Sequence, residues 1–204
     1  MRVLVACEFS GIVRDAFRAR GHDAISCDLL PSERPGPHIQ GDVLPHLGDG
    51  WDLMIAHPPC TDLALSGARW WPAKKADGRQ QAAVEFFRRL TEAPIPRKAV
   101  ENPIGIMSRL YRRPDQIVQP YWFGDSVQKA TCLWLWGLPR LTPTKVVDRG
   151  PICTAPNGKK HGGAHTMRGL VTTPVAWHNR HPKDRGLWRS RTFPGLATAM
   201  AEQW

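Results

Sequence analysis

The sequence predicts an α/β fold in which a parallel sheet carries helices on both faces. Short β-branched and apolar segments alternate with segments of helical spacing through residues 1–100. Most of the strand-like segments end at glycine, proline or polar residues, as strands of such sheets do. At 204 residues, of which 42% are hydrophobic, the chain is long enough to bury one large core.

The first elements form a strand–helix–strand unit. Residues 2–7 read RVLVAC and lead into a turn at residues 8–11. Apolar residues with helical spacing occupy residues 12–20, and Gly21 follows as a C-cap glycine does. Residues 24–28 are the second strand, and a proline-rich loop comes after it.

The later elements continue this alternation and then depart from it. Residues 51–56 (WDLMIA) and 98–101 (KAVE) are expected strands, and an amphipathic helix is expected at residues 79–90 between them. A further strand is expected at residues 130–135, and helical spacing returns at residues 193–204. The stretch before that last helix is rich in Gly, Pro, His and Arg, which predicts a loop-rich insertion.

Charge and composition favour a polyanionic partner and exclude several protein classes. Lys and Arg total 28 against 18 acidic residues, a formal net charge of +10, and residues 151–204 hold eight of the basic and two of the acidic residues. Such a field attracts nucleic acid, although a merely solvated basic surface is the alternative. No apolar stretch approaches the roughly 18 residues of a membrane helix, and the apolar start is too short for a secretory signal. Five cysteines without a CxxC pair indicate reduced thiols and a cytoplasmic protein.

Residues able to do chemistry follow the expected strands. Because ligands bind beyond the carboxyl ends of parallel strands, these residues are expected to share one edge of the sheet. They are the turn at residues 8–11, Asp28, Asp42 after a possible third strand, residues 58–60 and residues 101–102.

Cys60 and Glu101 are the candidate reactive groups. Two prolines precede Cys60 and present its thiol rigidly, and a thiolate is the best side-chain nucleophile at neutral pH. Glu101 stands beside Asn102 and Pro103, where a carboxyl group can hold or donate a proton at a ring nitrogen. A buried structural cysteine and a helix-capping acid are the alternatives.

The turn at Phe9, Ser10 and Gly11 occupies the usual position for a nucleotide cofactor. It is not a GxGxxG motif, so pyrophosphate binding is not indicated. An acid at Asp28 is placed to accept hydrogen bonds from ribose hydroxyls, and Asp42 lies one strand further. The pattern suits an adenosine without phosphates, such as that of S-adenosylmethionine.

Taken together, these segments resemble the motifs of the C5-cytosine DNA methyltransferases, in the same order, and in particular compact phage-type members. The first turn is similar to the acidic-Leu-Phe-x-Gly cofactor turn, and two acids match the ribose and adenine ligands. The Pro-Pro-Cys segment is similar to the nucleophile motif, and the Glu-Asn-Pro segment that follows it resembles Glu-Asn-Val. The matched residues are Glu8, Phe9, Ser10, Gly11, Asp28, Asp42, Pro58, Pro59, Cys60, Glu101, Asn102 and Pro103.

The resemblance also has departures. The first turn holds one glycine, Pro103 replaces the usual valine, and Gln128–Thr131 matches only loosely a later Gln-x-Arg-x-Arg motif. Lys129 or Thr131 would stand for its arginines.

The resemblance implies a Rossmann-like S-adenosylmethionine-dependent methyltransferase sheet with a small loop-rich DNA-recognition insertion. The chain would divide into a catalytic and cofactor-binding unit at residues 1–144, a target-recognition segment at residues 145–188 and a C-terminal helix at residues 189–204 that packs back on the first unit. A monomer acting on double-stranded DNA in the cytoplasm of a bacterium or a phage-infected host is expected.

The implied chemistry is a covalent adduct between Cys60 and carbon 6 of a flipped cytosine, with Glu101 acting at ring nitrogen 3 beside Asn102. The residues expected to contact DNA are Ser66, Lys129, Thr131, Lys159, Lys160 and Arg168. Trp70 or Trp71 would fill space in the DNA or pack under the loop after Cys60. No metal is expected, although Cys153 and the histidines at 161–181 leave a zinc site open as an alternative.

Three alternative functions are also compatible with the sequence. The same fold and nucleophile could transfer a modified group, such as carboxymethyl from carboxy-S-adenosylmethionine. The protein could bind DNA without catalysis, or it could modify free nucleotides such as dCMP.

Overall fold

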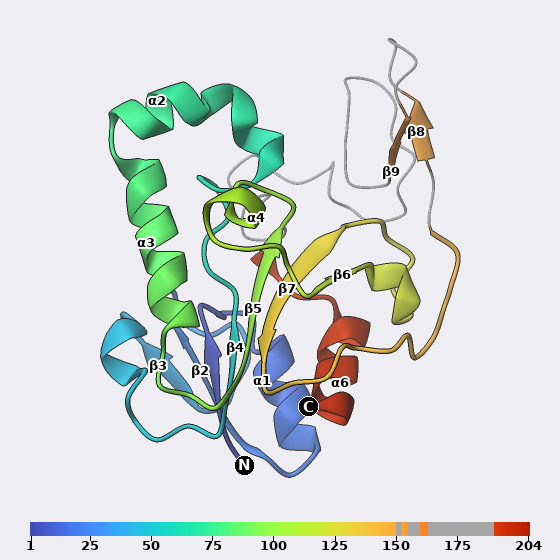
Figure 1. The fold of residues 1–204 in the computed structure, drawn as a ribbon. Coiled ribbons are helices and arrows are strands. Elements are labelled where there is room, and N and C mark those ends of the chain that lie inside the picture. Colours follow the sequence, from blue (N-terminus) through green and yellow to red (C-terminus); the bar gives the residue numbers. More distant parts are fainter. Residues whose placement is uncertain (150–151, 155–159, 163–189) are drawn as a thin grey trace.

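The computed structural model describes residues 1–149, 152–154, 160–162 and 190–204, and a seven-stranded sheet runs through its centre (Figure 1). The strands lie in the order β3-β2-β1-β4-β5-β7-β6. Their bounds are β1 Arg2–Ala6, β2 Asp23–Asp28, β3 His38–Gln40, β4 Leu53–Ala56, β5 Arg97–Pro103, β6 Gln116–Val118 and β7 Thr131–Trp136.

Three longer helices cover the sheet. They are α1 (Ile12–Ala19), α3 (Arg79–Thr91) and α6 (Pro194–Gln203). Two short helices are α2 (Trp71–Ala76) and α4 (Met107–Leu110), and three 3₁₀ turns span Leu44–His46, Leu65–Trp70 and Pro120–Trp122. A separate antiparallel pair is formed by β8 (Ile152–Thr154) and β9 (Lys160–Gly162). Within the described residues, no helix has the length and apolar character to span a membrane.

The sheet is Rossmann-like, which confirms the predicted fold class. Strands β3, β2, β1, β4 and β5 are parallel, and β7 pairs antiparallel with both β5 and β6. The order is therefore that of a doubly wound sheet with one reversed strand inserted beside β6. Because β7 is reversed, its first residues lie at the same edge as the carboxyl ends of the parallel strands.

Strand side chains alternate between two apolar layers. Val3 and Val5 pack with α1 and α6, whereas Leu4 and Ala6 pack with α3. Figure 1 shows the same division, with α3 on one side of the sheet and α1 beside α6 on the other. Burial on both faces explains why the central strands read as continuous apolar runs.

The helices begin, end and pack much as expected. Val13 and Phe17 of α1 are buried, and Phe87 and Leu90 of α3 are buried against the opposite face. Helix α6 packs against α1, the first helix of the chain.

Some elements differ from the expectation. β6 and the reversed direction of β7 were not predicted, since a three-residue strand has too little pattern to recognise and direction depends on pairing. The stretch after Cys60, expected as a loop, contains a 3₁₀ turn and α2. Residues 145–188 lie mostly outside the described residues, so the division at their boundaries stays a prediction.

Candidate functional site

The polar segments that the sequence singled out meet at the carboxyl edge of the sheet. Chain connections leave β1 and β4 in opposite directions at this edge, so it includes the switch point where doubly wound sheets bind ligands. Two groups of residues lie there. We call them the β1–β2 corner (residues 8–15 and 28–37) and the β4–β5 corner (residues 57–66 and 101–106).

In the β1–β2 corner, Glu8 caps helix α1. Its buried carboxylate accepts hydrogen bonds from the Ser10 hydroxyl and the Val13 amide, both at 2.9 Å. Gly11 is the N-cap residue of α1 with φ +71°, and a Cβ there would lie 2.6 Å from the Arg14 guanidinium. The turn therefore presents backbone at the edge, while the Glu8 side chain stabilises the helix N-terminus.

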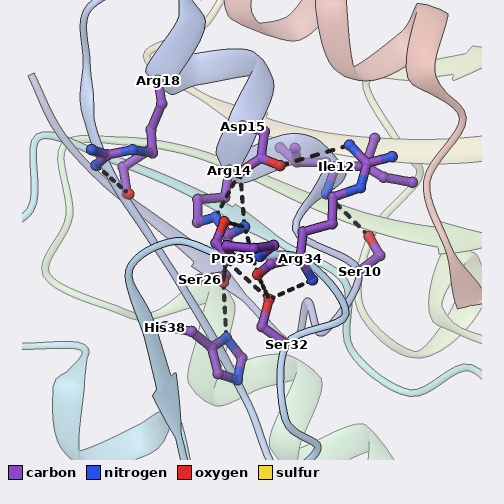
Figure 2. A network of polar contacts seen from close by, with 12 residues as sticks. Ser10, Ile12, Arg14, Asp15, Arg18, Ser26, Ser32, Arg34, Pro35 and His38 are labelled. Atoms are coloured by element: carbon purple, nitrogen blue, oxygen red, sulfur yellow. Dashed lines mark hydrogen bonds and ion pairs between the residues drawn. The ribbon is translucent and has the colours of Figure 1, made fainter.

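Arg14 ties the corner together, as Figure 2 shows. Its side chain is fully buried, and its guanidinium donates to two serine hydroxyls, two carbonyls and one carboxylate. These acceptors are Ser26 Oγ (3.3 Å), Ser32 Oγ (3.0 Å), Arg34 O (3.2 Å), Pro35 O (3.0 Å) and Asp15 Oδ1 (2.9 Å). Helix α1, strand β2 and the loop at 29–37 are thus joined through one side chain.

The loop at 29–37 has further contacts with the rest of the edge. Ser26 Oγ lies 2.9 Å from His38 Nδ1, and His38 Nε2 lies 2.9 Å from the Leu30 carbonyl. The Glu33 amide donates to the Phe9 carbonyl at 2.8 Å, and the Glu33 carboxylate pairs with Arg191. The loop is therefore held over the first turn.

Asp28 and Asp42 lie at the ends of β2 and just beyond β3. Their Oδ1 atoms accept the amides of Leu30 (2.9 Å) and Leu44 (3.0 Å). Burial, and after it the charges of Asp28, Cys27 and Asp42, raise the pKa of the Cys7 thiol. Cys7 itself is the one non-glycine residue with positive φ (58°) among the described residues.

In the β4–β5 corner, one hydrogen bond joins the two predicted reactive segments. Asn102 is buried and donates through Nδ2 to the Pro58 carbonyl at 2.9 Å. Pro58 is buried, whereas Cys60 is exposed. The amide side chain of Asn102 therefore fixes the position of the Pro-Pro-Cys segment relative to β5.

Backbone contacts fix the chain beyond Cys60 to the end of β5. The Ile106 amide donates to the Leu63 carbonyl, and the Leu65 amide donates to the Ile104 carbonyl, both at 2.9 Å. A Cβ on Gly105 would lie 2.2 Å from the Leu63 oxygen, so the two segments touch only because residue 105 is glycine.

Glu101 lies beside His57 in this corner. His57 Nδ1 is 3.4 Å from Glu101 Oε2, and the two side chains are 6% and 17% exposed. Burial raises the pKa of Glu101, but the hydrogen bond from His57 and the charge of Lys129 oppose it. The net result holds the pKa of Glu101 below its ordinary value, so the group is a carboxylate at neutral pH.

Lys129 and Thr131 approach Glu101 from the start of β7. Thr131 is buried, and Lys129 Nζ lies 5.6 Å from the Phe193 ring. A cavity of about 20 Å³, the room of one water molecule, lies among these side chains. Its lining residues are Glu101, Lys129, Thr131, Ser190, Arg191, Thr192, Phe193 and Leu196.

The remaining predicted DNA contacts are placed only in part. Ser66 is exposed in the 3₁₀ turn after Cys60. Trp70 is 56% exposed with Arg69 stacked 4.8 Å from its ring centre, whereas Trp71 packs against the core. Lys159, Arg168 and the side chain of Lys160 lie outside the described residues, as do the side chains of the zinc alternative. Within the described part of the chain, no group of His, Cys, Asp or Glu has the arrangement of a metal site.

Two functional candidates do not stand out in the sequence. Arg14 lies among apolar positions of a helix, and that placement of an arginine was the available signal. His57 comes directly before Pro-Pro-Cys, but only strand register shows that it lies opposite Glu101.

No family model matches the chain, and no curated protein sequence matches it either. Among solved structures, a similar chain is an E. coli protein described as a candidate DNA modification methyltransferase encoded within a prophage. The two share 18% sequence identity with a TM-score of 0.46. The similarity covers 72% of this chain and 52% of that one, so this chain spans about half of that protein's length.

Proposed function

We propose that the protein transfers a methyl group from S-adenosylmethionine to carbon 5 of cytosine in double-stranded DNA, with Cys60 as the nucleophile. The observation that carries the proposal is the hydrogen bond from Asn102 to the Pro58 carbonyl. It holds an exposed cysteine and a partly buried glutamate on the ends of adjacent strands, in the order and type that the family resemblance requires. A binding protein has no need for this pairing.

The proposed roles follow from the side-chain chemistry. The Cys60 thiolate adds to carbon 6 of cytosine, which makes carbon 5 nucleophilic. Glu101, held as a carboxylate, accepts a hydrogen bond from the exocyclic amino group, and ring nitrogen 3 takes up a proton from solvent as charge develops there. Carbon 5 takes the methyl group, and loss of the carbon 5 proton to solvent then breaks the bond between Cys60 and carbon 6 and restores the thiolate. Asn102 positions the Pro-Pro-Cys segment. Since these ring atoms are covered in a stacked duplex, the base is flipped out.

The β1–β2 corner fits the adenosine part of S-adenosylmethionine. Asp28 offers carboxylate oxygen to ribose hydroxyls, and Leu29 beside it is 73% exposed and offers an apolar surface to the adenine. The two carboxylates of Asp28 and Asp42 disfavour a phosphate-bearing cofactor and favour a cationic one. When bound, S-adenosylmethionine supplies an electrophilic methyl group. The Glu8 carboxylate contributes by holding the shape of the turn at Phe9, Ser10 and Gly11.

The test is mass analysis of nucleosides from mixed-sequence duplex DNA incubated with the protein and S-adenosylmethionine. We expect 5-methylcytosine with the wild type and with Thr198→Ala, a substitution on the exposed face of α6, and none with Cys60→Ala. DNA from an expressing host is analysed in parallel, because the host supplies its own donors and target sites.

Three results would contradict the proposal. Modified cytosine that persists in Cys60→Ala removes the nucleophile assignment. A heavier cytosine derivative in host DNA that requires Cys60 identifies a modified donor instead of S-adenosylmethionine. DNA binding that is equal in both proteins, with no modified nucleoside from either DNA, identifies a protein that binds without catalysis.

A further inference from the structure

His57 and Glu101 are direct neighbours across two parallel strands. The register of β4 and β5 pairs Ala56 with Val100, so the next residues along both strands come together at the edge. Residues in register share a face of the sheet, and His57 Nδ1 accordingly lies 3.4 Å from Glu101 Oε2. The contact is built by the backbone and depends on no flexible segment.

Among residues 1–149, 152–154, 160–162 and 190–204, the buried imidazole makes this polar contact through Nδ1, and its other nitrogen has no partner. His57 Nε2 is one of four buried side-chain N or O atoms without a hydrogen-bond partner among the described residues. Such an atom has lost its hydrogen bond to water without gaining one in the protein, which destabilises the folded state. An apolar side chain would fill the same space without that penalty, so packing does not account for a histidine here.

The charges around Glu101 identify what the histidine supplies. A carboxylate only accepts hydrogen bonds, so the proton of the contact belongs to His57 Nδ1. Lys129, just before β7, and Thr131, its first residue, also favour the ionised form of Glu101. Burial and the Glu101 charge raise the pKa of the Cys132 thiol to about 11. Arg191 lines the same cavity while pairing with Glu33. Among these groups, His57 is the hydrogen-bond donor that directly precedes Pro58, Pro59 and Cys60 in the chain.

We infer that His57 is a positioning residue of the β4–β5 corner: its Nδ1–H donates to the Glu101 carboxylate and orients it toward the base that Cys60 attacks. The inference rests on the proposed function for its substrate. It adds to the resemblance, which assigns no role to the residue before Pro-Pro-Cys.

Two substitutions separate hydrogen bonding from packing. His57→Asn keeps a donor near the Nδ1 position, whereas His57→Phe keeps a ring and removes the donor. We expect kcat/KM for DNA modification to fall roughly 10- to 100-fold in His57→Phe and less in His57→Asn, with the loss in kcat. The acid limb of the pH–rate profile moves to higher pH in His57→Phe, because Glu101 then binds its proton more readily. The control is His46→Asn, since His46 also pairs with an acid (Asp49, 3.1 Å) but on the surface, and we expect no change.

A second measurement is independent of activity. The Glu101 carboxyl group is titrated by ¹³C NMR in the wild type and in folded His57 variants, with Glu101→Gln as the assignment control. Its pKa should rise in His57→Phe and rise less in His57→Asn. If His57→Phe does not fold, the titration and pH–rate profile of His57→Asn decide the question.

The outcomes distinguish the two proposals. An unchanged Glu101 titration together with unchanged kcat in the folded variant overturns the role of His57, even if the wild type methylates DNA. A titration that moves as expected in a protein without any transfer activity overturns the proposed function and leaves the coupling of His57 to Glu101 in place.

Discussion

The two corners of the site differ in how completely their buried polar side chains are hydrogen-bonded. In the β1–β2 corner, the Glu8 carboxylate and the Arg14 guanidinium are both hydrogen-bonded to the protein itself. In the β4–β5 corner, His57 keeps a buried nitrogen that has no partner in the part of the chain that the structure describes, and Cys60 is exposed. Trp70, a few residues further, is also largely exposed.

This difference suggests that the β1–β2 corner has mainly a structural and binding role and that the β4–β5 corner has the reactive role. Internal hydrogen bonds stabilise the β1–β2 corner and preform it, which suits the binding of a ligand of fixed shape. The His57 nitrogen that has no hydrogen-bond partner among the described residues lowers stability in the β4–β5 corner, as is common in functional sites. Substitutions in the first corner should therefore lower the free energy of unfolding, and those in the second should lower activity.

The largest effect is expected from Arg14→Met. This change leaves the two serine hydroxyls and two carbonyls of the network without their buried donor, so the free energy of unfolding should fall by about 3 kcal/mol in urea denaturation. Arg18→Met on the exposed face of the same helix is the control and should change it by no more than about 0.5 kcal/mol. Equal losses in the two variants would show that the network does not stabilise the corner.

Asn102→Leu should affect both stability and activity. The substitution keeps the shape of the side chain but leaves the Pro58 carbonyl without its donor, at a loss of about 1–2 kcal/mol in urea denaturation. Misplacement of Cys60 should lower kcat for DNA modification roughly 100-fold. Full activity in this variant would contradict the positioning role of Asn102.

A smaller effect concerns pH. The folded-state pKa of Glu101 is below its ordinary value of 4.5, so the carboxylate contributes stability above that pH and loses the contribution as pH falls through the folded pKa. Wild type should exceed Glu101→Gln in stability by more at pH 7 than at pH 3, as measured by urea unfolding at each pH. A difference that is constant with pH would contradict the lowered pKa.

The smallest effect on stability is expected from alkylation of Cys60, and here the measured quantity is the reactivity of the thiols. In a Cys153→Ser background, iodoacetamide at pH 8 should modify exposed Cys60 first, while burial raises the pKa of Cys27 and Cys132 to about 11 and slows their reaction. The modified protein should unfold at the same Tm within about 1 °C, because an exposed side chain carries little packing energy. Mass spectrometry of peptides reads the order of modification, and a buried thiol that reacts as fast as Cys60 would contradict it.

The positions of strands and helices could be predicted from local sequence pattern, because the apolar residues of each element repeat with the spacing of its buried face. The 3.6-residue period located α1 and α3, and apolar runs located β1 and β4. Since parallel strands end at a common edge, the placement of Asp28 and Glu101 at that edge also followed from the sequence.

Tertiary structure decided the contacts between segments that are far apart in the chain. Strand register brings His57 to Glu101, and the reversed insertion of β7 brings Lys129 to the same carboxylate. The burial of Arg14 depends on a loop about twenty residues away that supplies its acceptors. Local periodicity determines which face of an element is buried, whereas the partner of a polar side chain on that face depends on pairings that exist only once the sheet has formed.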